Sequence, residues 1–123
     1  MRIMLIAAAL LVSACAQTQT PAPDPAAVSV GAELEAMAAD GREIATAQCA
    51  ACHSVGEYGE SPNPQAPVFR AIFQRYDPAV LEDELIAGIR VSHPMPDFQL
   101  NPQGVDELIV YLRSIQEPPP ATH

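Results

Sequence analysis

The 123-residue chain carries six arginine residues, no lysine and fifteen acidic residues, which gives a formal net charge of −9. This balance argues against a nucleic-acid partner, because binding to phosphates requires a basic surface. The length allows at most one domain. Since neither end of the chain looks like part of a packed core, the folding unit is small, and such a unit usually needs a disulfide, a metal or a cofactor for stability.

Residues 1–14 have the pattern of an export signal. Arg2 precedes an apolar run over residues 3–12 that is followed by small residues, and the run is too short for a permanent membrane-spanning helix. The segment Val12–Cys15 resembles a bacterial lipoprotein box, in which the cysteine becomes the lipidated first residue of the mature chain. Ordinary cleavage after Ala16 is the alternative. We favour lipidation of Cys15, which predicts a periplasmic protein anchored to a membrane surface.

Proline-rich segments flank the expected domain. Residues 15–31 contain several prolines and no periodic pattern, which predicts a semi-extended linker. Residues 118–123 begin with three consecutive prolines and are expected to form a flexible tail. The folded domain is therefore assigned to residues 32–117.

The domain is expected to be all-α, because no run of alternating apolar and polar residues predicts a strand. Asp40 and Glu43 have the spacing of a capping box, which predicts a helix that begins at Asp40 and continues through Gln48. In the alternative, a turn or two around residues 33–38 extends this helix upstream, with Gly41 as the weak point.

Two further helices have clear start signals. In each, a good N-cap residue precedes a proline, at Asp77-Pro78 and at Asn101-Pro102. The first helix is expected to end at Gly88, and the second before the prolines that begin at Pro118. Apolar residues recur at helical spacing on one face of each helix: Val80, Leu81, Leu85 and Ile86 in the first, and Val105, Leu108, Ile109, Leu112 and Ile115 in the second. Segments 54–67 and 91–100 are expected as long loops, which are uncommon in a compact domain unless they wrap a group.

The segment Cys49-Ala50-Ala51-Cys52-His53 has the spacing of a haem-attachment motif. Two thiols about one helical turn apart can add to the two vinyl groups of a haem, and the next histidine then lies under the ring, where it binds the iron. A redox-active thiol pair is one alternative, but the sequence lacks the strand–loop–helix setting of such pairs. A zinc site that adds His93 to the motif is another, although structural zinc usually takes its ligands from two paired clusters. We therefore predict one covalently bound haem c, with His53 on its iron.

Met95 is the first choice for the sixth iron ligand. After removal of the signal only Met37 and Met95 remain, and Met37 precedes the motif on the helix that approaches from the proximal side. Met95 lies between Pro94 and Pro96, whose rings restrict the backbone. A neutral thioether favours ferrous iron and raises the reduction potential. Two alternatives stay open: His93 as the ligand, and Met95 as a side chain that only fills the core.

From about residue 40 to residue 116 the chain resembles class I cytochromes c. The resemblance rests, in order, on a helix into Cys49–His53, on Pro67, on Met95 between prolines, and on a C-terminal helix with Tyr111-Leu112. It implies a cytochrome c fold of three or more short helices and long loops around one haem. It also implies that the Pro67 backbone carbonyl accepts a hydrogen bond from the second ring nitrogen of His53.

Other residues of this region are candidates for contacts with the haem. Aromatic side chains are expected to form walls of the haem pocket, or equally of an ordinary core: Phe69, Phe73, Tyr76 and Phe98. Arg70 or Arg75 could pair with a haem propionate, although a solvated arginine is an equal alternative.

The expected function is single-electron transfer between redox proteins, not catalysis. With His53 and Met95 both bound to the iron, no position is open for a substrate, and the resemblance implies the same role. A haem-based sensor or a haem enzyme subunit is the alternative, and it would need a displaceable sixth ligand. A structural lipoprotein without a cofactor is a third possibility, which the motif argues against.

If Cys15 is lipidated, the mature protein carries acyl groups at its N-terminus and sediments with membranes. Cys15→Ala should then release the protein into the soluble periplasmic fraction, and intact-mass measurement of the wild type checks for the acyl mass. A mature N-terminus at Gln17 without that mass would contradict lipidation.

Overall fold

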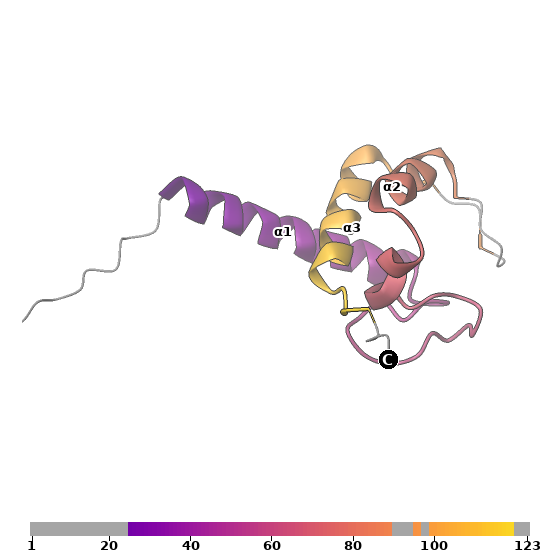
Figure 1. Cartoon of the computed structure of the whole chain (residues 1–123). Coiled ribbons are helices and arrows are strands. Elements are labelled where there is room, and N and C mark those ends of the chain that lie inside the picture. Colours follow the sequence, from indigo (N-terminus) through magenta and orange to yellow (C-terminus); the bar gives the residue numbers. More distant parts are fainter. Residues whose placement is uncertain (1–24, 90–94, 97–98, 120–123) are drawn as a thin grey trace, which may run out of the picture.

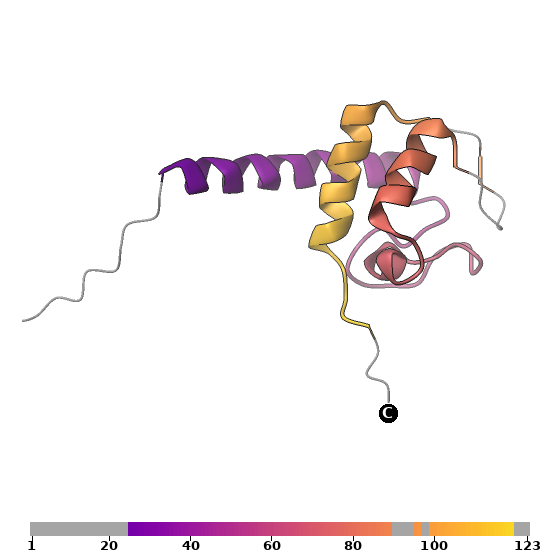
Figure 2. The ribbon, with the colours of Figure 1, turned by 45° about the horizontal axis from the view of Figure 1, so that its top comes forward.

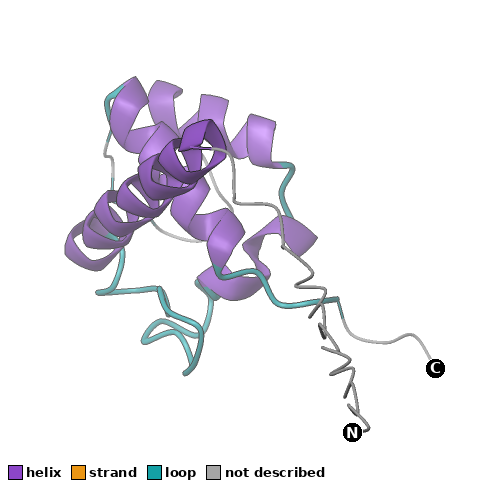
Figure 3. Ribbon diagram, turned by 90° about the vertical axis from the view of Figure 1, so that its left-hand side faces the viewer, coloured by secondary structure: helices purple, strands orange, loops and turns teal. Residues whose placement is uncertain are grey.

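The computed structural model describes residues 25–89, 95–96 and 99–119. In chain order its elements are α1 (Pro25–Gln48), the 3₁₀ helix η1 (Phe69–Gln74), α2 (Pro78–Ala87) and α3 (Pro102–Ser114) (Figure 1). The described part consists only of helices and loops (Figure 3), so the expected all-α class is confirmed. Among the described residues, no helix combines the length and the apolar character that crossing a membrane requires.

The N-terminal helix is longer than the sequence predicted. α1 spans 24 residues and runs without a break past Asp40, so the helix start expected at Asp40 is wrong. The alternative, in which residues 33–38 extend the helix upstream, is confirmed, although α1 begins earlier still, at Pro25. Pro25 suits the first turn of a helix, where the missing N–H has no partner to lose, and residues 32–47 are rich in alanine and other strong helix formers. Residues 25–31 of the expected extended linker are thus helical. The part of α1 before Gly41, residues 25–40, projects away from the other helices as an arm (Figure 2).

α1 and α3 cross at close range, and this contact forms the centre of the core. Gly41 lies against the backbone of α3, where an added Cβ atom would overlap the carbonyl group of Glu107. Ala45 of α1 and Val105 of α3 are both 0 % exposed, and Leu108 is 2 % exposed. The missing side chain at Gly41 therefore lets the two helices approach until their backbones are in contact.

The start signals of α2 and α3 act as the sequence predicted. The Asp77 carboxylate accepts hydrogen bonds from the first available backbone N–H groups of α2 at 2.9 and 3.4 Å. Asn101 Oδ1 accepts one from the N–H of Gly104 at 2.8 Å. α2 ends at Gly88, whose φ of 95° is open to glycine without strain.

The buried face of α2 is narrower than expected. Leu81 and Leu85 are buried, whereas Val80 and Ile86 are 55 % and 37 % exposed, so the four residues do not form one core face. α2 packs against the domain on one side only, along the line of its two leucines. The apolar stripe of α3 is confirmed more fully, because its four central members are buried: Val105, Leu108, Ile109 and Leu112.

The 3₁₀ helix η1 was not expected from the sequence. Its buried residues are Phe69 and Ile72, which lie three positions apart, as three residues per turn require. One pair at this spacing is too short a pattern to predict an element. η1 nevertheless matters for the interior, since it begins two residues after Pro67 and carries Phe69 into the core.

Gly41→Ala should lower the free energy of unfolding by about 1–3 kcal/mol, because the added methyl group cannot fit against Glu107 unless a helix moves. Gly31→Ala is the matched control in the arm of the same helix, where nothing lies within 4 Å of the added atom. The control should leave the unfolding midpoint unchanged or slightly raised, since alanine favours a helix. Thermal unfolding followed by circular dichroism makes the comparison. Equal midpoints for the two variants would contradict the close crossing.

Candidate cofactor site

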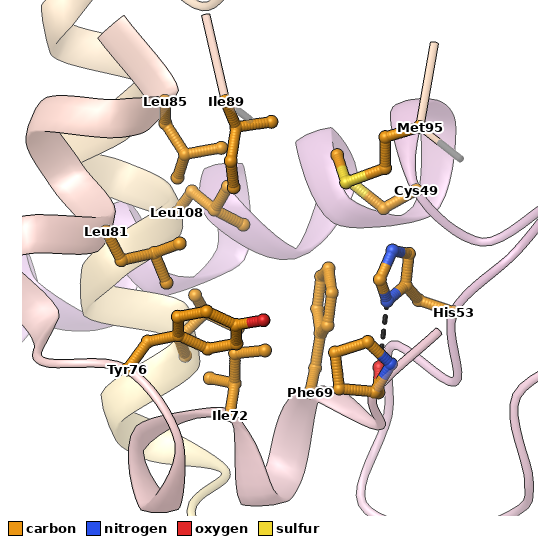
Figure 4. A pocket seen from close by; sticks show the side chains of 12 residues that line it. Cys49, His53, Phe69, Ile72, Tyr76, Leu81, Leu85, Ile89, Met95 and Leu108 are labelled. Carbon is orange, nitrogen blue, oxygen red and sulfur yellow. Dashed lines mark hydrogen bonds between the residues drawn. The ribbon is translucent and has the colours of Figure 1, made fainter. Parts of the chain in front are cut away.

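An apolar cavity lies between the C-terminal end of α1, η1, α2 and α3 (Figure 4). Most of its wall consists of aliphatic and aromatic side chains: Phe69, Ile72, Tyr76, Leu81, Leu85, Ile89, Leu108 and Leu112. The other lining residues are Cys49, His53, Pro67 and Met95. Four residues that the sequence singled out for cofactor chemistry thus line the same cavity.

The motif Cys49–His53 continues the last turn of α1. The N–H of Cys49 donates to the carbonyl of Ala45 at 3.0 Å, and the N–H groups of Cys52 and His53 both donate to the carbonyl of Cys49, at 3.1 and 2.9 Å. Cys49 is buried and lines the cavity, whereas Cys52 is partly exposed and lines a surface hollow that Met95 also borders. Both cysteines are free thiols, and the turn keeps them close together.

The ring of His53 is held at one nitrogen and on one face. His53 is 7 % exposed, and its Nδ1–H donates to the carbonyl oxygen of Pro67 at 2.8 Å (Figure 4). A carbonyl oxygen can only accept, so Nδ1 carries the proton, and in the neutral ring Nε2 carries the lone pair that a metal ion requires. The ring of Phe69 packs against the imidazole, with the ring centroids 5.0 Å apart. The hydrogen bond that the resemblance implies between His53 and Pro67 is therefore present.

Hydrogen bonds close the long loop between His53 and Pro67. The carbonyl of Ser54 accepts from the N–H of Phe69 at 2.9 Å, which joins the two ends of the loop. The Ser54 hydroxyl donates to the carbonyl of Tyr58 at 3.0 Å, and the Ser54 N–H donates to the Ser61 hydroxyl at 3.0 Å. Ser54 thus holds Pro67 within reach of the histidine. Sequence reasoning missed this role, because a serine in a loop carries no distinguishing pattern.

The aromatic residues expected as pocket walls divide into three groups. Phe69 and Tyr76 line the cavity. Phe73 does not, since it packs at the edge of the core, where the guanidinium of Arg113 lies 5.7 Å from its ring centroid. Phe98 lies outside the described residues, as does His93, the alternative iron or zinc ligand.

Neither candidate arginine lines the cavity. Arg70 is engaged elsewhere, since its guanidinium pairs with the carboxylate of Glu117 at 3.2 Å and donates to the carbonyl of Gly59 at 2.7 Å. Arg75 is exposed.

Burial controls the ionisation of the buried thiol. It raises the pKa of Cys49 well above its ordinary value, to about 11, so this group is a neutral thiol at pH 7.

Over the described ranges, no three His, Cys, Asp or Glu side chains gather as they would around a metal ion held by such residues alone.

The residues of the cavity fit haem c. Attachment through two thioethers requires two thiols about one turn apart, which Cys49 and Cys52 supply. The hydrogen bond to Pro67 sets the tautomer of His53, so that its Nε2 can bind a metal ion. Met95, which lines the same cavity, offers a soft thioether. The aliphatic wall provides the dry surface that a large flat macrocycle needs.

The chain matches the family model described as cytochrome C oxidase, cbb3-type, subunit III over residues 36–112, a range that includes the motif Cys49–His53 and all the residues that line the cavity. A search of curated proteins and a search of solved structures each find no match. Because the family model matches more than half of the chain, the chain belongs to this family and is a class I c-type cytochrome that binds haem c covalently.

Proposed function

We propose that this protein is a single-electron carrier in which His53 and Met95 are the two axial ligands of the haem iron. The observation that carries the proposal is that both side chains line the same apolar cavity, which Cys49 also lines. Membership of a c-type cytochrome family supports haem-based electron transfer. When bound, haem c supplies a reversible one-electron couple, and the protein supplies ligation, orientation and a dry environment.

Cys49 and Cys52 are the attachment residues in this proposal. Each sulfur forms a bond to one carbon of a vinyl group, and the thiol hydrogen passes to the other carbon, so attachment is an addition that needs no oxidant. Cys49 and Cys52 are not joined in a disulfide, so both sulfur atoms are available for this addition. The N–H groups of Cys52 and His53 donate to the Cys49 carbonyl and hold the turn of the motif. Two thioether bonds from this turn would therefore fix the macrocycle relative to α1.

His53 and Met95 divide the tuning of the iron. The hydrogen bond from His53 Nδ1 to Pro67 orients the imidazole and increases the electron density at Nε2, which stabilises ferric iron. The Met95 thioether is a weaker, soft ligand that stabilises ferrous iron. With both ligands bound, the iron can alternate between the ferrous and ferric states without a change of ligands.

A carrier role follows from two occupied axial positions. A sensor or an enzyme would need a sixth ligand that leaves easily. The family is named for an oxidase subunit, so an electron-delivering subunit of a larger complex is the second candidate. Co-purification of the protein with other oxidase subunits at a fixed ratio would favour that candidate.

The partners of this carrier are redox proteins in the periplasm or at a membrane surface, where Cys15 would provide the anchor. The formal charge of −9 favours partners with a basic face, because opposite charges speed association and raise its dependence on salt.

Protein purified from a strain that matures c-type cytochromes should stay coloured after extraction with acidified acetone, because Cys49 and Cys52 hold the chromophore by covalent bonds. The variant with Cys49→Ala and Cys52→Ala should lose its colour in the same extraction. A wild-type protein that loses its colour, or that is colourless and contains zinc, would refute the attachment.

Sulfur ligation gives ferric haem a weak far-red band, which Met95→Ala should abolish. The same variant should have a lower reduction potential and should bind carbon monoxide or cyanide, because the thioether both stabilises ferrous iron and blocks access. His93→Ala is the control for the rival ligand and should retain the band. Ready binding of carbon monoxide by the wild type, together with an altered spectrum of His93→Ala, would assign Met95 to packing and favour a sensor or an enzyme.

A further inference from the structure

The segment that follows α3 is bonded to η1 along most of the length of that helix. Gln116 and Glu117 make hydrogen bonds with residues 69, 70, 73 and 74, the first two and the last two residues of η1. A 3₁₀ helix has poor hydrogen-bond geometry and is weak on its own. Contacts from outside therefore have a large share in fixing the position of η1.

Gln116 makes the central contacts through both ends of its amide. Its Nε2 donates to the carbonyls of Phe69 and Leu112, both at 2.8 Å, and its Oε1 accepts from the N–H of Phe73 at 3.2 Å. The bond to Leu112 holds the side chain on the last turn of α3, and the other two reach the two ends of η1. The side chain is partly buried, which shields these bonds from water. The ion pair between Glu117 and Arg70 is more exposed, at 47 % for the Glu117 side chain, and contributes less.

The residues that Gln116 holds lead directly to His53. The Phe69 ring packs on the imidazole, and Pro67, two residues earlier, accepts the Nδ1 hydrogen bond. The backbone of Phe69 is bound on both sides, since its N–H donates to Ser54 and its carbonyl accepts from Gln116. Movement of η1 would therefore change both contacts of the histidine ring.

We infer that Gln116 is a positioning residue for His53. It acts through Phe69 and Pro67 and thereby sets the strength of the hydrogen bond from His53 Nδ1 to the Pro67 carbonyl. The inference rests on the proposed function, in which His53 binds the iron. A shorter bond to Pro67 makes the imidazole a stronger donor and stabilises ferric iron. Loosening η1 should weaken this bond, so the reduction potential should rise even though Gln116 does not line the cavity.

Gln116→Met tests this, because methionine has nearly the same length and loses all three hydrogen bonds. We expect a higher reduction potential than in the wild type and shifted ring-proton resonances of His53 in the ferric protein, while the far-red band of sulfur ligation remains. Gln103→Met is the control at the opposite end of α3, where the side chain of the exposed Gln103 donates to the side chain of Glu107 at 2.8 Å. The control should leave the potential and the resonances unchanged.

Gln116→Asn is a milder variant that keeps an uncharged amide but is one methylene too short to reach both ends of η1. It should shift the potential in the same direction by a smaller amount, and it serves if Gln116→Met does not accumulate. If either variant lowers the unfolding temperature but keeps the potential and the resonances of the Gln103→Met protein, Gln116 only stabilises the fold and the inference is wrong. A wild type without covalent colour or without the far-red band would instead contradict the proposed function.

Discussion

The contact between Gly41 and the backbone of Glu107 determines how closely α1 and α3 approach, and the site is built outward from that crossing. Along α1, the crossing buries Ala45, one turn before the motif. Along α3, it continues into Leu108, which lies on the cavity wall. Since Cys49 follows the last residue of α1 and its N–H is bound to Ala45, the direction in which the motif faces depends on the crossing. A larger side chain at residue 41 would therefore disturb the site as well as the helix pair.

The apolar cavity makes the cofactor part of the core. Buried side chains of α2 and α3 line the cavity where a larger domain would have another layer of residues. A macrocycle bound there would make close van der Waals contacts with these side chains. A group attached through Cys49 and Cys52 cannot dissociate, and its contribution to stability would not depend on its concentration.

Local chemistry determined which features could be predicted from the sequence. The helix starts at Asp77 and Asn101 depend only on a side chain and the next few N–H groups, so they could be predicted. The spacing of the two cysteines and the histidine in Cys49–His53 is itself what haem attachment requires, so the motif could be predicted too. The capping box at Asp40 failed because the alanine-rich residues before it favour a helix more than the cap favours a boundary. η1 and the cavity wall depend on which elements meet in space. Gln116 bonds to Phe73 and Phe69, which precede it in the sequence by 43 and 47 positions, and no local sequence pattern predicts contacts over such a separation.

The arm leads to the motif along one continuous helix, since Cys49 directly follows the last residue of α1, and this helix links their orientation as well as their distance. Each residue of an α-helix adds about 1.5 Å of length and turns the chain by about 100°. One residue inserted in the arm would thus move the domain only about 1.5 Å farther from residue 25, but it would rotate the cavity by about 100° about the helix axis. Seven inserted residues would restore the direction to within about 20°. The length of the arm therefore sets the direction in which the cavity faces relative to residue 25.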